Sequence, residues 1–118
     1  MPRILLVEDD ADIRFLWEHV LLDQGYQVDS AESIAAGGGL LEERAYDLVV
    51  VDGRLPDGTG VALAEAATQR GLPALVVTGY AFIMDQARQE SAKYELLLKP
   101  IRPSELVAAV ARILQPPG

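Results

Sequence analysis

Short apolar runs alternate along this chain with longer stretches in which apolar residues recur every three or four positions. Four of the runs are continuous: residues 4–7, 48–51, 74–77 and 96–98. Continuous runs of this length are typical of strands that are buried on both faces of a parallel sheet. Residues 26–31 resemble a weaker strand. The pattern therefore predicts five short strands.

The stretches between these strands have the 3.6-residue period of helices. The apolar positions of the first stretch share one helical face: Ile13, Leu16, Trp17, Val20 and Leu21. We expect Asp10 to cap the start of this helix and Gly25 to end it. Four further helices are predicted, over residues 33–44, 60–70, 82–91 and 103–114. The glycine triplet 37–39 predicts that the second helix is broken or short, since each glycine costs up to ~1 kcal/mol relative to alanine.

Five repeats of strand then helix predict an α/β domain with a mainly parallel sheet and helices on both faces. The 118 residues suit one domain, which we expect to span residues 1–118 without a linker. Hydrophobic residues make up 50% of the chain and charged residues 24%, as in globular rather than disordered proteins.

Charge and residue usage exclude several function classes. The formal net charge of −8 disfavours binding to nucleic acids and to anionic membranes. The chain has no cysteine and a single histidine, His19, so Cys-ligated and His-cluster metal sites are excluded. The apolar run near the first residue is shorter than the apolar region of a signal peptide, and no apolar run reaches about 18 residues. These features predict a cytoplasmic protein.

Polar groups follow four of the five predicted strands. They are Glu8-Asp9-Asp10, Asp52, Thr78-Gly79-Tyr80 and Lys99-Pro100. In open α/β sheets, ligands bind beyond the carboxyl ends of the strands, so these groups should meet at one edge. Converging carboxylates repel one another unless a cation lies between them, and an all-oxygen ligand set suits Mg²⁺. A metal ion, Lys99 and a hydroxyl around one carboxylate suggest phosphoryl transfer to Asp52.

The motifs ILLVEDD, VVVDGRLPDGTG, VVTGY and LLLKP, in this order, resemble the receiver domains of bacterial response regulators. The resemblance covers essentially the whole chain. It implies the flavodoxin-like (CheY-like) fold, a five-stranded parallel sheet in strand order 2-1-3-4-5. It also implies a signalling module of two-component systems that is not an enzyme, apart from catalysing its own phosphorylation and dephosphorylation.

The resemblance also assigns roles to individual residues. Glu8, Asp9, Asp52 and the backbone carbonyl of Arg54 would bind Mg²⁺ or Mn²⁺, and Asp52 would accept the phosphoryl group. Thr78 and Lys99 would bind the phosphoryl oxygens, with Thr78 as the switch hydroxyl.

A cis bond before Pro100 would aim Lys99 into the site. The general acid that a haloacid-dehalogenase phosphatase needs two residues after its nucleophile is replaced by Arg54, which argues against that enzyme class.

Two features depart from the family pattern. Leu96 occupies the position of the usual aromatic switch, and Tyr94 is expected to have the wrong strand parity to replace it. Pro73 with Val77-Thr78-Gly79-Tyr80 resembles a stand-alone subgroup, in which Tyr80 would take over part of the readout. Large side chains at Arg54 and Tyr80 are also expected to slow loss of the phosphoryl group.

The expected partners are a histidine kinase or phosphotransfer protein as donor and a further protein downstream. The surface that binds the downstream partner is expected to be the fourth helix, fifth strand and fifth helix, about residues 81–114. That partner could be a second copy of the chain, in a phosphorylation-dependent homodimer. The alternative is a degenerate receiver that binds partners without phosphorylation, an alternative that Leu96 keeps open.

Overall fold

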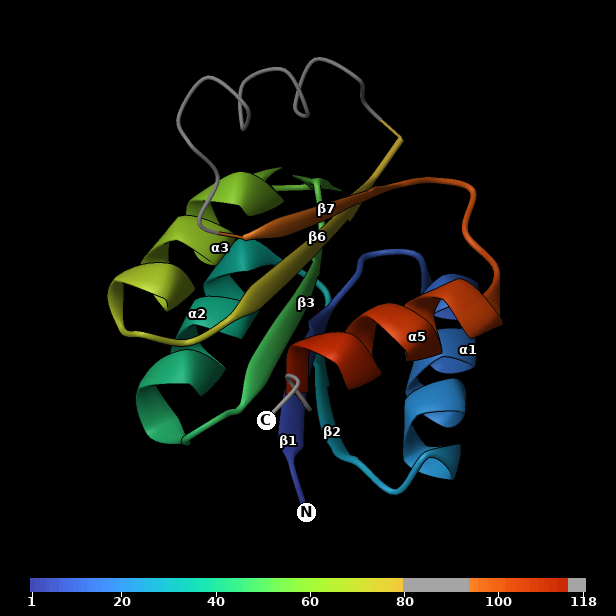
Figure 1. Cartoon of the computed structure of the whole chain (residues 1–118). Helices are drawn as coiled ribbons and strands as arrows, with labels where there is room; N and C mark the ends of the chain where they lie inside the picture. Colours follow the sequence, from blue (N-terminus) through green and yellow to red (C-terminus); the bar gives the residue numbers. More distant parts are fainter. Residues whose placement is uncertain (80–93, 115–118) are drawn as a thin grey trace.

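A computed structural model describes residues 1–79 and 94–114 of the chain. Its centre is a sheet of five parallel strands in the order β2-β1-β3-β6-β7 (Figure 1). The strands are β1 (Arg3–Val7), β2 (Gln27–Ala31), β3 (Leu48–Asp52), β6 (Ala74–Thr78) and β7 (Glu95–Leu98). The predicted α/β fold and its flavodoxin-like strand order, 2-1-3-4-5 when only the sheet strands are counted, are confirmed.

Helices cover both faces of the sheet. They are α1 (Ala11–Asp23), α2 (Ile34–Glu43), α3 (Gly60–Gln69) and α5 (Pro103–Leu114). Helices α1 and α5 lie on one side and α2 and α3 on the other (Figure 1). The predicted helix over residues 82–91 falls outside the described residues. Within the described part of the chain, none of the helices has the length and apolar character needed to span a bilayer.

The two core layers follow from the alternation of side chains along each strand. In β1, Leu5 and Val7 pack toward α2 and α3, whereas Ile4 and Leu6 pack toward α1 and α5. All residues of β3 and β6 are buried, as a continuous apolar run in a parallel strand predicts. The central strands are therefore packed on both faces, and their ends position the polar groups that follow.

The local signals at the first helix act as predicted. The Asp10 carboxylate caps α1 by accepting hydrogen bonds from the amides of Asp12 and Ile13 at 2.9 and 3.1 Å. Gly25 has a φ of 92°, a backbone conformation that glycine adopts without the steric cost of a side chain. The chain therefore turns sharply into β2.

Helix α2 contradicts the prediction that the glycine triplet breaks it. The helix runs without interruption from Ile34 to Glu43. A Cβ atom on Gly37 would lie 2.9 Å from Val7 Cγ2 and 3.1 Å from Leu63 Cδ2. The missing side chain at Gly37 therefore lets α2 approach β1 and α3 closely, and this packing offsets the low helix propensity of glycine.

A small hairpin follows β3, where the sequence pattern predicted no strand. Strand β4 (Arg54–Leu55) pairs antiparallel with β5 (Gly58–Thr59), and Pro56 and Asp57 form the turn. Leu55 is buried in the core layer beneath α2 and α3. The hairpin that follows Asp52 is therefore packed against the core through Leu55.

Candidate functional site

The polar groups predicted from the strand ends lie together at the carboxyl edge of the sheet. The parallel register pairs Asp52 with Val77 and Thr78 with Leu98, so β3, β6 and β7 end at neighbouring positions. Glu8 and Thr78 are fully buried and Asp52 is 7% exposed. Such burial is costly for carboxylates unless other groups compensate it, so this edge must contain charge partners.

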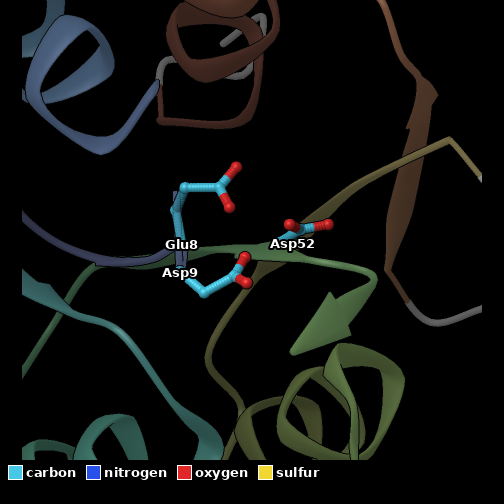
Figure 2. A group of neighbouring side chains, drawn as sticks. All are labelled: Glu8, Asp9 and Asp52. Atoms are coloured by element: carbon cyan, nitrogen blue, oxygen red, sulfur yellow. The ribbon is translucent and has the colours of Figure 1, made fainter. Parts of the chain in front are cut away.

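Three carboxylates meet at this edge (Figure 2). Glu8, Asp9 and Asp52 each offer one oxygen, and these oxygens lie within 4.8 Å of one another. Glu8 and Asp9 follow β1, and Asp52 ends β3. A set of hard oxygen donors, with an exposed carboxylate at Asp9, fits Mg²⁺, which binds one or two carboxylates and keeps several waters.

Lys99 supplies the fixed positive charge of the site. Its Nζ donates to Glu8 Oε1 at 3.0 Å and to Asp52 Oδ2 at 3.3 Å. Its backbone amide donates to the carbonyl of Thr78 at 2.8 Å, so the start of the loop after β7 is held to the end of β6. The Lys99–Pro100 peptide bond is cis. Lys99 therefore bridges the two most buried carboxylates.

Burial and neighbouring charges shift the pKa values of two of these groups. Burial, a hydrogen bond with Asp52 and repulsion by its charge raise the pKa of Glu8 to about 7, although Lys99 acts in the opposite direction. For Lys99, burial lowers the pKa, but Glu8 and Asp52 together outweigh that effect and raise it above its ordinary value. In the metal-free protein, Glu8 therefore takes up a proton at a higher pH than an ordinary carboxyl group, and Lys99 stays charged.

Asp52 is held by the backbone of the hairpin. Its Oδ1 accepts a hydrogen bond from the amide of Arg54, an exposed residue, at 3.2 Å. Its Oδ2 accepts from Lys99. Each oxygen of Asp52 is therefore held by a different partner, one from the hairpin and one from the segment after β7. The role of the Arg54 carbonyl as a metal ligand stays a prediction.

Two glycines to which the sequence analysis gave no role in the site are required by close packing. A Cβ atom on Gly53 would lie 2.4 Å from Cβ of Thr78, and one on Gly60 would lie 1.9 Å from the backbone oxygen of Asp52. Both distances are far below van der Waals contact. A glycine directly after a strand that ends in a carboxylate is the sequence signal that could have identified Gly53.

Two residues of α1 also contact the site. The guanidinium of Arg14 donates to the backbone oxygen of Glu8 at 2.8 Å. Trp17, which we expected only in the core, is 4% exposed, and Lys99 Nζ lies 5.5 Å from the centre of its ring. A cation at this distance from an indole face is attracted by the ring. The helical pattern placed Trp17 on the buried face but gave no signal for this contact.

The positions that depart from the family pattern are only partly described. Leu96 is half-buried and packs against the core layer beneath α2 and α3. Tyr94 belongs to the same layer, so the expectation that it has the wrong parity relative to Leu96 is wrong: residues two apart share a face. Tyr80 lies outside the described residues.

Comparison with known proteins agrees with this site. The family model "Response regulator receiver domain" matches residues 4–111. The chain belongs to the response-regulator receiver family. Receivers of this family are signalling modules of two-component systems that are phosphorylated on an aspartate, and the acidic pocket suits Mg²⁺ and that modification. The stand-alone subgroup suggested by Tyr80 stays a prediction.

Individual members of this family show the extent of the similarity. The phosphate regulon transcriptional regulatory protein PhoB of Klebsiella pneumoniae is 33% identical in an alignment of 118 positions that covers 96% of this chain and 52% of PhoB. This chain thus spans about half the length of that relative.

Two solved structures are also similar. The non-phosphorylated HemR receiver domain from Leptospira biflexa has a TM-score of 0.85 and 33% identity, covering 100% of this chain and 98% of that one. The response regulator TrrA from Thermotoga maritima, in complex with Mg²⁺-BeF, has a TM-score of 0.85 and 27% identity, covering 97% of this chain and 100% of that one.

Proposed function

We propose that this receiver accepts a phosphoryl group on Asp52 from a histidine kinase or phosphotransfer protein and then changes its binding to a downstream protein. The observation that carries the proposal is the environment of Asp52. This carboxylate is 7% exposed, ends a central strand, and lies within hydrogen-bond distance of Lys99 Nζ and the Arg54 amide. A nucleophile fixed in this way is already oriented for attack on phosphorus.

In the proposed transfer, a carboxylate oxygen of Asp52 forms a bond to phosphorus, and the bond between phosphorus and the donor's imidazole nitrogen breaks. The electron pair of the broken bond stays on the imidazole. Lys99 neutralises negative charge beside Asp52, and Thr78, at the end of β6, is the hydroxyl that would bind a phosphoryl oxygen.

Glu8 and Asp9, with the Asp52 carboxylate and the Arg54 carbonyl, would hold Mg²⁺ or Mn²⁺. When bound, the ion would neutralise developing charge on the phosphoryl oxygens. Because the pKa of Glu8 is raised to about 7 in the metal-free protein, Glu8 would give up its proton when the ion binds.

The downstream protein would bind the surface formed by residues 81–114. The structure describes β7 and α5 of this surface. Leu98 on β7 is 47% exposed, although it is a large apolar residue. Glu95 on β7 forms an ion pair with Arg112 on α5, which connects the two elements at this surface. An exposed leucine suits a protein partner or a second copy of the chain. The net charge of −8 disfavours nucleic acid or an anionic membrane as the direct partner.

The proposal treats residues 1–118 as one receiver domain that acts in the cytoplasm and catalyses only its own phosphorylation and dephosphorylation. Leu96, in the position of the usual aromatic switch, favours a second candidate, a degenerate receiver that binds its partner without phosphorylation. Phosphorylation of Asp52 distinguishes the two.

The first experiment measures the intact mass of the protein after incubation with acetyl phosphate and Mg²⁺. We expect one added phosphoryl group, because Asp52 is oriented and charge-compensated in the folded chain. Asp52→Asn should carry no adduct, and removal of Mg²⁺ by a chelator before incubation should prevent its formation.

An adduct that persists in Asp52→Asn would contradict the assignment of the phosphoacceptor. If the folded protein forms no adduct and also fails to bind beryllofluoride with Mg²⁺, the degenerate receiver is supported instead.

A further inference from the structure

The tip of the hairpin after Asp52 is attached to a distant helix by one side chain. Asp57, in the turn between β4 and β5, accepts a hydrogen bond from the amide of Ile34 on Oδ1 at 2.9 Å and from the amide of Ala35 on Oδ2 at 3.0 Å. These two amides are the first of α2, and they have no acceptor within their own helix. Both lower the pKa of the Asp57 carboxyl group, so it is charged at neutral pH.

Helix α2 already has a cap of its own. Ser33 precedes the helix, and its hydroxyl accepts a hydrogen bond from the amide of Ala36 at 3.1 Å. Asp57 adds a second cap from 23 residues away in the chain. The two caps differ in one respect: Ser33 connects α2 only to itself, whereas Asp57 connects α2 to the hairpin.

Among the described residues, the other contacts that fix the hairpin include two backbone hydrogen bonds near its base and the burial of one side chain. The amide of Gly53 donates to the carbonyl of Val77 at 3.0 Å, and the amide of Gly60 donates to the carbonyl of Gly53 at 3.0 Å. Leu55 is buried in the core. At the turn, the Asp57 carboxylate makes the two hydrogen bonds to α2. The neighbouring Gly58 lies close to the same helix, since a Cβ atom added to it would be 3.1 Å from Ile34 Cδ1.

We propose that Asp57 is a positioning residue, which fixes the hairpin on α2 and thereby holds the Arg54 backbone in the geometry that binds Mg²⁺ beside Asp52. The inference rests on the proposed function, because it takes the Arg54 carbonyl as a ligand. Arg54 lies in the β4 strand, which pairs with β5 across the turn that Asp57 holds. A carbonyl that must point at a small cation tolerates little movement, so an anchor three residues away affects the affinity.

The test compares Asp57→Asn and Asp57→Ala with Ser33→Ala as the matched control. Each variant removes capping interactions from the same end of α2, but only the Asp57 variants release the hairpin. Mg²⁺ affinity is measured by titration without a phosphodonor, followed by NMR, and unfolding temperature by thermal melting. Amide hydrogen exchange at Arg54 and Gly60 is measured in the metal-free proteins.

We expect all three variants to melt at lower temperature than the wild type. We expect Mg²⁺ affinity to fall roughly tenfold in Asp57→Ala, less in Asp57→Asn, which keeps one acceptor oxygen, and not at all in Ser33→Ala. Exchange at Arg54 and Gly60 should accelerate only in the Asp57 variants.

If both Asp57 variants bind Mg²⁺ as tightly as the wild type, Asp57 is a helix cap only and the positioning role is overturned, while the proposed function stands. If Ser33→Ala weakens Mg²⁺ binding as much as Asp57→Ala, the effect belongs to the stability of α2, which also overturns the proposal. A folded wild-type protein that binds no Mg²⁺ would overturn both the positioning role and the proposed function.

Discussion

At the scale of single residues, Glu8 places a carboxyl group in the interior of the protein. Its side chain is fully buried, and it shares Lys99 with a second carboxylate. One lysine cannot neutralise two carboxylates, so the site has a deficit of positive charge that is relieved either by a proton on Glu8 or by a cation. This competition between a proton and a metal ion is the basis of a pH-dependent prediction.

We predict that the metal-free protein loses stability as the pH rises from about 4.5 to about 7. The pKa of Glu8 is near 4.5 in the unfolded chain and is raised to about 7 in the folded protein. Between these values the folded state binds more protons than the unfolded state, so the free energy of unfolding falls with rising pH, by on the order of 1–3 kcal/mol. Chemical denaturation at several pH values measures this change.

Glu8→Gln is the control for that measurement. Glutamine cannot ionise, so the variant should show a smaller fall in stability over the same pH interval. Saturating Mg²⁺ should also remove the fall in the wild type, because the cation replaces the proton. A variant whose pH profile parallels that of the wild type would assign the change to other groups.

The residues of the site divide into those that the sequence could and could not reveal. Asp52, Thr78 and Lys99 were found because each follows an apolar run, and parallel strands end at one edge. The contacts of Arg14 with Glu8, and of Asp57 with α2, gave no signal. Both contacts depend on the direction of a side chain or on the packing of segments that are distant in the chain. The spacing of apolar residues along the sequence gives no information on either.

At the scale of elements, α2 shows how packing overrides propensity. Its three consecutive glycines predicted a break, yet the helix is continuous. Gly37 is buried against Val7 and Leu63, whereas added Cβ atoms on Gly38 and Gly39 would meet nothing within 4 Å. Among the described contacts, packing therefore requires a glycine at position 37 but not at positions 38 and 39.

We predict that Gly38→Ala and Gly39→Ala each stabilise the protein by up to about 1 kcal/mol, because alanine loses less backbone entropy in a helix and has room at both positions. Gly37→Ala should give a smaller gain or a loss, since its methyl group would contact Val7 Cγ2 at 2.9 Å. Urea denaturation of the three variants measures the order. A gain at Gly37 equal to that at Gly38 would show that Val7 and Leu63 move aside without cost.

At the scale of the whole molecule, the site joins elements that are far apart in the chain. Glu8 follows β1, and Lys99 follows β7, 91 residues later in the chain. Their ion pair links the ends of β1 and β7, which are separated in the sheet by β3 and β6. The strand order was expected from the family resemblance. The contact of α1 with the site was not expected. Trp17 lies near Lys99 because α1 packs on the same face of the sheet as α5, which follows Lys99 in the chain.

This arrangement makes Trp17 a natural reporter of the site. It is the only tryptophan in the chain, it is 4% exposed, and its ring lies 5.5 Å from Lys99 Nζ. A phosphoryl group on Asp52 would give Lys99 a new anionic partner and so change the position of its charge relative to the ring. We therefore predict that Trp17 fluorescence changes when acetyl phosphate is added in the presence of Mg²⁺, with the extent of modification followed by intact mass in the same samples.

Asp52→Asn separates the two causes of such a change. In this variant Mg²⁺ alone can still alter the emission through Glu8, Asp9 and Lys99, but acetyl phosphate should add nothing further. In the wild type, the change caused by acetyl phosphate should decay at the rate at which the adduct disappears from the mass spectrum. If the adduct forms and the emission stays constant, Lys99 keeps its place against Trp17 during phosphorylation, and the switch must act through Thr78 without moving the lysine.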